Sequence, residues 1–276
     1  MEKMNSIVLV TGATDGIGKA TALELAKRGM YVIVHGRNLK KVEQTLAEIH
    51  QQVPNAQLDY AVADFSSLAE VGTLAEDLLA RFSILNVLIH NAGVYLKSRQ
   101  MSADGYEMTF AVNHLAPFAL TQLLLPRLRE SHARVITVAS MVHANVPVNF
   151  DNLNAERHYD GYKAYAQSKT ANILFATELA EREQGNLTSN SLHPGVIATK
   201  LLAAGFGISG ASPERGAATS VYLATAEEVA NVSGKYFVDC QEKKPAAHAI
   251  DSTIRKRLWK VSEEMIKNKL GAIWQA

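Results

Sequence analysis

The sequence predicts an α/β fold in which a single, doubly wound parallel sheet is flanked by helices on both faces. Short apolar runs alternate with longer stretches of helical periodicity, which is the pattern of successive strand–helix–strand units. Several runs are apolar at nearly every position, such as Ile7–Val10 and Val87–Ile89. Such runs suit strands that are buried on both faces, as in a parallel sheet between two layers of helices.

Strands and helices are expected in alternation along the chain. The strands are expected near Ser6–Thr11, Tyr31–His35, Gln57–Ala63, Leu85–His90, Ala133–Ala139 and Leu187–His193. The helices fill the intervals, at about Ile17–Lys27, Leu39–Gln52, Leu68–Phe82, Ala103–Arg129 and Tyr162–Glu183. No internal repeat, linker or break in composition divides the chain, so we expect one domain over residues 1–276.

Composition and charge narrow the classes of protein. Of the 276 residues, 47% are hydrophobic and 20% are charged, which is ordinary for a globular protein with a substantial core. A formal net charge of +1 gives no electrostatic reason to expect a nucleic acid partner. Cys240 is the only cysteine, which favours a reducing compartment. No stretch approaches the ~18 uninterrupted apolar residues of a membrane span, so we expect a cytoplasmic protein.

A glycine-rich turn directly follows the first expected strand. It runs Thr11-Gly12-Ala13-Thr14-Asp15-Gly16-Ile17-Gly18 and opens the first helix. Glycines in such a turn let the backbone approach a phosphate closely, and the start of the helix supplies free N–H donors. At the first strand–helix junction, such a turn indicates a Rossmann-type dinucleotide-binding site, with a purely structural turn as the alternative.

The end of the second expected strand distinguishes NAD from NADP. A carboxylate at this place usually binds the ribose hydroxyls of NAD, whereas an arginine accommodates the 2′-phosphate of NADP. The sequence reads His35-Gly36-Arg37-Asn38, without an acid, and two lysines follow. We therefore expect NADP rather than NAD, although Asp15 adds a negative charge near the phosphates. The alternative is that these basic residues only solvate the start of a helix.

Tyr165 and Lys169 lie four positions apart in the helix expected over Tyr162–Glu183. Positions i and i+4 share one face of a helix, so the phenol and the ammonium group lie side by side. A phenol titrates near pH ~10 when unperturbed, and a nearby positive charge favours its ionised form. Such a pair can donate or accept a proton in a reaction. By itself, the spacing also fits an ordinary solvated helix face.

Other candidate residues stand at the carboxyl ends of expected strands. Asp64-Phe65, Asn91-Ala92-Gly93 and Ser140 occupy these positions. Ligands bind at this edge in open α/β sheets, so these residues are candidates for one shared site. Each of them alone also fits a turn residue that satisfies its own backbone.

Together these motifs resemble those of the short-chain dehydrogenase/reductase family. Over Asp151–Gly195 and Gly234–Phe237, the chain looks most like the retinol-dehydrogenase-like branch. The resemblance covers almost the whole chain, in the order of the family: Thr11–Gly18, Asn91–Gly93, Asn113, Ser140, Tyr165 with Lys169, and Pro194–Thr199. It implies an NADP(H)-dependent oxidoreductase that moves hydride between nicotinamide and a carbonyl or alcohol.

The resemblance also implies roles for individual residues. Tyr165 would act as general acid/base, Lys169 would lower the pKa of Tyr165 and bind the nicotinamide ribose, and Ser140 would hold the substrate oxygen. Asn113 would hold a water that relays protons to the lysine, in a helix that Pro117 is expected to kink; a structural amide is the alternative. The cofactor contacts would be Gly12, Thr14, Asp15, Gly16, Ile17, Gly18, Arg37, Asn38, Asp64, Phe65, Asn91, Ala92, Gly93, Tyr165, Lys169, Pro194, Gly195, Ile197 and Thr199.

The segment at about 200–212 predicts an apolar substrate. Its glycines alternate with bulky apolar residues, which is typical of a mobile lid and also fits a surface loop that docks back. We expect a lipophilic ketone or aldehyde, or the corresponding alcohol, and no metal. The expected substrate contacts are Ser140, Val142, Tyr165, Leu201 and Phe206, with Tyr95 and Met141 nearby.

Two further segments bear on partners. The residues between Ser140 and Tyr165 outnumber those of compact family members, so a polar loop at about Val142–Gly161 is expected over the site or beside the tyrosine helix. This loop favours a monomer, or a dimer through another surface, over a tetramer. Residues 250–270 predict a basic amphipathic helix, whose apolar side we expect to pack on its own domain rather than on a membrane.

Two other functions remain open at this point. A dinucleotide-sensing regulatory protein would bind NADP(H) without turnover, which the set of Asn113, Ser140, Tyr165 and Lys169 disfavours. A light-dependent pigment reductase of the protochlorophyllide type shares the fold. That branch usually carries cysteines around its site, whereas Cys240 lies near the end of the fold.

Overall fold

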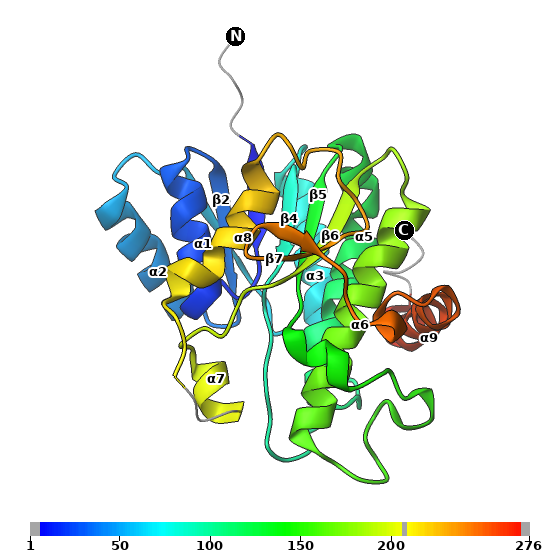
Figure 1. Cartoon of the computed structure of the whole chain (residues 1–276). Coiled ribbons are helices and arrows are strands. Elements are labelled where there is room, and N and C mark those ends of the chain that lie inside the picture. Colours follow the sequence, from blue (N-terminus) through cyan, green and yellow to red (C-terminus); the bar gives the residue numbers. More distant parts are fainter. Residues whose placement is uncertain (1–5, 206–208, 272–276) are drawn as a thin grey trace.

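The computed structural model describes residues 6–205 and 209–271, which form one sheet between two layers of helices (Figure 1). The strand order is β3-β2-β1-β4-β5-β6-β7-β8. All neighbouring strands are parallel except β7 and β8. The chain therefore winds outward from β1 in both directions, and the predicted Rossmann-type, doubly wound fold is confirmed.

The strands expected from the sequence are present, and two short strands extend the sheet. The expected ones are β1 (Ile7–Val10), β2 (Tyr31–Gly36), β3 (Leu58–Val62), β4 (Val87–His90), β5 (Arg134–Val138) and β6 (Thr188–His193). The additional ones are β7 (Tyr236–Val238) and β8 (Gln241–Lys243). With three residues each, they are too short for a periodic pattern to reveal them.

The helices divide between the two faces of the sheet, and each face has its own apolar core. One face is covered by α1 (Gly16–Lys27), α2 (Leu39–Gln52) and α8 (Pro213–Thr225). The other is covered by α3 (Leu68–Arg81), α5 (Ala116–Glu130), α6 (Gly161–Arg182) and α9 (Ser252–Leu270). The sequence did not predict α8, because alanine, serine and threonine make up much of it and leave no clear apolar stripe.

The helix expected over Ala103–Arg129 starts later and is interrupted. It consists of α4 (Met108–Phe110), a π-helical turn at Ala111–Leu115 and α5. Pro117 has no N–H to offer the carbonyl four residues earlier, which belongs to Asn113, and the backbone widens at this point. The predicted irregularity at Pro117 is therefore a π turn that contains Asn113.

The C-terminal amphipathic helix is present as α9 and lies along α6 (Figure 1). Its apolar residues Leu258, Trp259, Ile266 and Leu270 are buried in the same core as α5 and α6. Charged groups fix the contact as well: Arg255 Nε lies 3.1 Å from the Glu178 carboxylate of α6. The apolar stripe thus packs on its own domain, as the sequence predicted.

The long segment before α6 folds beside that helix, as predicted. It forms two 3-10 turns, η2 (Met141–Asn145) and η3 (Phe150–Asn152). Thr170 Oγ1 donates to the Val146 carbonyl at 2.7 Å, and Gln167 Oε1 accepts from the Asn149 N–H at 2.9 Å. Both bonds tie the segment to the flank of α6.

One helical stretch among the described residues, Met108–Glu130, has the length and apolar composition of a membrane span. Of its most apolar window, 78% is buried inside the fold. The sequence did not predict this stretch as a membrane span, because polar residues interrupt its apolar run. Its burial identifies it as a helix of the core.

Candidate active site

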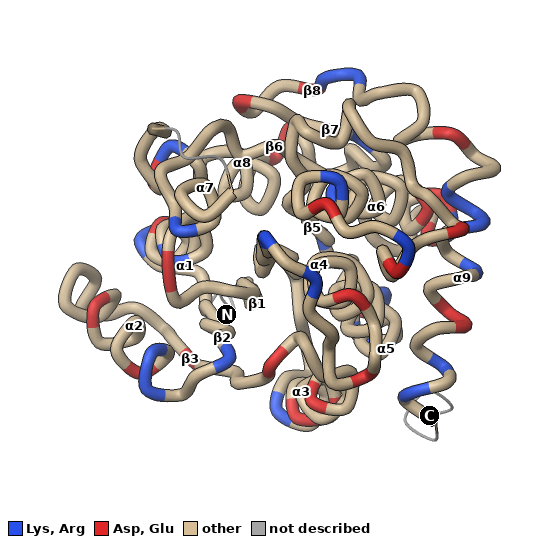
Figure 2. The backbone as a smooth tube through the Cα atoms, turned by 90° about the horizontal axis from the view of Figure 1, so that it is seen from below, with Lys and Arg blue, Asp and Glu red and all other residues tan. Residues whose placement is uncertain are grey.

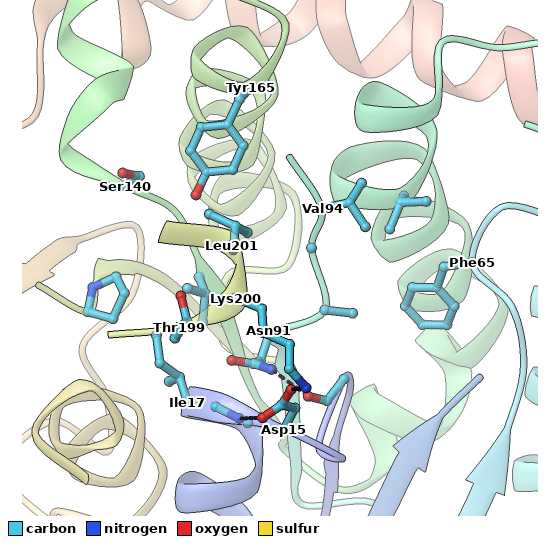
Figure 3. A pocket seen from close by; sticks show the side chains of 18 of the residues that line it. Asp15, Ile17, Phe65, Asn91, Val94, Ser140, Tyr165, Thr199, Lys200 and Leu201 are labelled. Carbon is cyan, nitrogen blue, oxygen red and sulfur yellow. Dashed lines mark hydrogen bonds and ion pairs between the residues drawn. The ribbon is translucent and has the colours of Figure 1, made fainter. Parts of the chain in front are cut away.

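A cavity of about 1020 Å³ lies at the carboxyl ends of the parallel strands (Figure 3). The glycine turn borders one part of it, and Ser140 and Tyr165 border another. Of the predicted site residues, only Asn113 does not line it, and Phe206 lies outside the described residues. Those that line it are Gly12, Thr14, Asp15, Gly16, Ile17, Gly18, Arg37, Asn38, Asp64, Phe65, Asn91, Ala92, Gly93, Ser140, Val142, Tyr165, Lys169, Pro194, Gly195, Ile197, Thr199 and Leu201.

The glycine turn is held against the loop after β4 so closely that side chains are excluded. Gly12 has φ +63°, and a Cβ on it would lie 2.8 Å from the Ala92 Cα. A Cβ on Gly18 would lie 2.3 Å from the Asn91 amide nitrogen. That amide donates to the carbonyls of Thr11 at 2.8 Å and Gly12 at 3.1 Å. Asn91 therefore fixes the shape of the turn while also lining the cavity.

His35 supports the glycine turn through a hydrogen bond, a role that the sequence did not predict. Its Nδ1 accepts from the Gly12 N–H at 3.3 Å, so Nε2 carries the proton and donates to the Ala63 carbonyl at 3.2 Å. The ring stacks on Phe65 with 4.5 Å between centroids. Burial lowers the pKa of His35 to about 4, so the ring is neutral at pH 7. The signal in the sequence was a lone polar residue inside the apolar run of β2.

The corner between β2 and α2 carries the expected basic residues. Arg37 is exposed and lines the cavity, and no described residue forms an ion pair or hydrogen bond with its guanidinium. The Asn38 side chain caps α2 by accepting from the Lys41 N–H at 3.1 Å. Figure 2, which views the molecule from the carboxyl ends of the strands, shows basic residues at the start of α2. The charge of Arg37 thus remains available to a ligand.

Tyr165 and Lys169 meet Ser140 at the other part of the cavity. The two α6 side chains are buried, with exposed fractions of 6% and 3%. Lys169 Nζ donates to the Val138 carbonyl at the end of β5 at 3.0 Å and lies 5.5 Å from the centre of the Tyr165 ring. The Tyr165 hydroxyl and the Ser140 side chain line the same part of the cavity, and Ser140 acts to lower the pKa of the phenol. A phenol, a serine hydroxyl and an amine are thereby gathered at one strand end, which is a set able to bind and protonate an oxygen.

Burial governs the titration of this pair. It raises the pKa of Tyr165 well above its ordinary value, and the hydrogen bond with Ser140 acts in the opposite direction. Burial lowers the pKa of Lys169 to about 8. The expected lowering of the Tyr165 pKa by Lys169 stays a prediction, since burial and Ser140 are the causes that shift this pKa in the structure.

Asn113 lies behind the cavity and is completely buried. Its amide nitrogen donates to the Val94 carbonyl at 3.0 Å and to Ser168 Oγ at 2.9 Å, and its oxygen accepts from the Val94 N–H at 2.7 Å. The amide thus connects the π turn, the loop after β4 and α6. These bonds match the structural alternative, and the role in proton relay stays a prediction.

The short helix α7 (Lys200–Gly205) borders the cavity on the side of the predicted lid. Lys200 Nζ lies 2.5 Å from the Asp15 carboxylate and so connects α7 with the glycine turn (Figure 3). The hydrogen bond from Lys200 lowers the pKa of Asp15. A Cβ on Gly205 would lie 3.0 Å from the Tyr95 ring, whose centre is 5.7 Å from that of Tyr165. The sequence indicated the negative charge of Asp15 but not its pairing with Lys200, which neutralises that charge.

Comparison with known proteins places these features in a family. A family model described as short chain dehydrogenase matches residues 6–206. The chain is 40% identical to human retinol dehydrogenase 13, over 94% of this chain and 84% of the relative. It is 39% identical to retinol dehydrogenase 14 of Mus musculus, over 94% and 85%.

Solved structures agree. A protein from Mycobacterium paratuberculosis superposes with a TM-score of 0.80 and 31% identity, over 96% of both chains. A short chain dehydrogenase from Escherichia coli CFT073, complexed with NADPH, gives a TM-score of 0.72 and 26% identity, over 86% of this chain and 98% of the other. The chain therefore belongs to the short-chain dehydrogenase/reductase family of oxidoreductases and, within it, to the retinol-dehydrogenase-like branch.

Proposed function

We propose that the protein is an NADP(H)-dependent oxidoreductase that interconverts an apolar ketone or aldehyde and its alcohol. The observation that carries this proposal is that Tyr165, buried beside Lys169, lines with Ser140 the same cavity that the glycine turn borders. The bound nicotinamide would supply or accept the hydride. In reduction, Ser140 would hold the carbonyl oxygen by a hydrogen bond and Tyr165 would give that oxygen its proton.

The residues present fit a dinucleotide. Gly12 and Gly18 let the turn pack against Ala92 and Asn91 while it lines the cavity, and its backbone leads directly into the N-terminus of α1. At the ribose end, Arg37, which pairs with no described residue, offers a forked, charge-assisted contact to a 2′-phosphate. The neighbouring structure with NADPH supports the same cofactor here. NADP is accordingly proposed over NAD.

The substrate class follows from the walls of the cavity near Tyr165. Apolar side chains line the cavity together with Tyr165, including Met108, Met141, Val142, Leu201 and Leu202. The relatives act, by their name, on retinol, which is an apolar alcohol. We accordingly propose a bulky lipophilic carbonyl or alcohol as substrate. We also propose a cytoplasmic location. For the assembly, we propose a monomer, or a dimer through a surface other than α6, because α9 already covers α6.

A panel assay tests both parts of the proposal. Oxidation of NADPH and NADH would be followed with bulky apolar and with small charged carbonyls, for the unchanged protein, Tyr165→Phe and Tyr162→Phe. Tyr162 is the matched control, since it lies on the same helix but does not line the cavity.

We expect NADPH-dependent reduction of bulky carbonyls. Tyr165→Phe should lose activity by roughly 10²–10⁴-fold, the usual contribution of general acid catalysis, while it still binds NADPH. Tyr162→Phe should stay active. Full activity of Tyr165→Phe would end the proposed mechanism, and activity confined to small charged carbonyls would refute the substrate class. NADPH binding without any turnover would favour the regulatory alternative.

A further inference from the structure

His143 lies three residues after Ser140, in the turn η2, and is buried with an exposed fraction of 4%. One ring nitrogen, Nδ1, is 2.7 Å from the Ser140 carbonyl oxygen. The other, Nε2, accepts from the Ala246 N–H at 3.2 Å. The imidazole therefore bridges the backbone of the serine to a segment about a hundred residues further along the chain.

These two contacts fix the state of the ring. A backbone N–H can only donate, so Nε2 must be an unprotonated acceptor, and Nδ1 must carry the proton that is donated to the Ser140 carbonyl. Burial, helped by the nearby His248, holds the pKa of His143 below its ordinary value despite the bond to Ser140, which is consistent with a neutral ring.

The backbone of His143 is fixed from two further sides. Its carbonyl accepts from His248 Nε2 at 2.8 Å and from Thr170 Oγ1 at 3.2 Å. Thr170 follows Lys169 on α6, and His248 belongs to the short turn η4 (Ala247–Ala249). The turn that carries Ser140 is thereby attached both to the helix that carries Tyr165 and to the C-terminal segment.

We propose that neutral His143 is a positioning residue for Ser140, and that residues 246–248 thereby hold the serine hydroxyl beside Tyr165. The inference rests on the proposed function of Ser140 and adds a determinant outside the cavity. The Ser140 Oγ has little support within η2, since the bond that it accepts from the Val142 N–H is long, at 3.5 Å. Small displacements of a catalytic group are costly, so the bridge through His143 should affect the rate rather than cofactor binding.

A double-mutant cycle separates positioning from general stability. His143→Phe removes both ring bonds and keeps an aromatic ring against Tyr236, which lies 5.1 Å away between centroids. We expect kcat for bulky carbonyls to fall on the order of tenfold, with the Kd of NADPH changed by less than about twofold. In the Ser140→Ala background, the same substitution should have no further effect on the residual kcat.

Two milder variants test each side of the bridge without removing the ring environment. His143→Asn places an amide N–H near the position of Nδ1, so it should recover most of the kcat that His143→Phe loses. Ala246→Pro deletes only the N–H donor, because the φ of −59° at this residue already fits proline. It should lower kcat by about threefold, the worth of one ordinary hydrogen bond. Ala246→Ser, which keeps the N–H, is the matched control and should be unchanged.

The proposal is overturned if His143→Phe lowers kcat by the same factor in Ser140→Ala as in the unchanged protein. The effect of His143 would then not pass through Ser140. Unchanged kcat in both His143→Phe and Ala246→Pro would overturn it as well. Failure of the proposed function gives a different result: Tyr165→Phe would remain fully active, whatever the His143 variants do. Should His143→Phe fail to fold, His143→Asn and Ala246→Pro still decide the question in the same assay.

Discussion

The two ends of the cavity differ in how deeply their functional side chains are buried and in whether other residues hold them. At the proposed catalytic end, Tyr165 and Lys169 are buried, and the Val138 carbonyl holds the Lys169 amine. At the end that would select the cofactor, Arg37 is exposed and free of described partners. The catalytic end therefore depends on the packing of α6 against the sheet, whereas cofactor choice depends on one side chain at the rim. Changes at the two ends should differ accordingly in their effect on stability.

The largest expected effect is at Lys169. Burial depresses its pKa from 10.5 to about 8, so keeping this amine charged at pH 7 costs the fold about 3 kcal/mol. Lys169→Met should abolish activity but raise the free energy of unfolding at pH 7 by up to that amount. Chemical denaturation of both proteins measures the difference, with Lys163→Met, an exposed lysine of the same helix, as the control.

The same burial predicts a pH dependence with a definite sign. Between pH about 8 and 10.5, the unfolded chain binds the Lys169 proton more tightly than the folded chain does. The stability contribution of this group therefore rises with pH across that window, and its cost is fully present below it. Lys169→Met should remove this rise relative to the unchanged protein. Parallel stability curves for the two proteins between pH 7.5 and 10, as chosen assay limits, would contradict the burial of a charged amine.

Arg37→Ala tests the opposite end. We expect the Kd of NADPH to rise roughly tenfold to a hundredfold, as for the loss of a charged hydrogen-bonding partner, while the Kd of NADH stays the same. The melting temperature should not change, because the side chain is exposed. Lys40→Ala is the control, since this neighbouring exposed lysine does not line the cavity. An equal loss of affinity for both cofactors would show that Arg37 does not read the 2′-phosphate.

The smallest expected effect concerns the ion pair between Lys200 and Asp15. Lys200→Ala should weaken NADPH binding about twofold to fivefold, because it leaves the carboxylate of Asp15 uncompensated beside the glycine turn, and exposed ion pairs are worth little. In an Asp15→Asn background, the same substitution should have almost no effect. Cofactor titration of the four proteins gives the coupling, and additive effects would mean that Lys200 acts independently of Asp15.

Much of the architecture was readable from the sequence, because strands such as β1 and β4 carry apolar runs and the helices between the strands show helical periodicity. Ser140 and the glycine turn could be placed together because strand ends of a parallel sheet share one edge, whereas Tyr165, on a helix, was joined to them by the resemblance to the family. The support of the site could not be read in this way. His35, His143 and Lys200 act across many residues of sequence, and no spacing rule relates each of them to its partner.

The titration of Tyr165 shows a second limit. Its neighbour Lys169 could be read from the spacing, whereas the degree of burial could not, because it depends on the segments that cover α6. The sign of the pKa change follows from that burial.

The position of α9 has a consequence for how the chain folds. Trp259 packs edge-on against Phe118 of α5, with 4.9 Å between ring centroids, and stacks near Phe175 of α6. During synthesis these partners leave the ribosome long before Trp259, so one face of the sheet stays incompletely covered until the last helix emerges. The other face, which carries the glycine turn, draws most of its apolar core from α1, α2 and the strands. These elements are synthesised before α9. The apolar core on the face of α5 and α6 is therefore complete only once α9 has been synthesised and packs on these two helices.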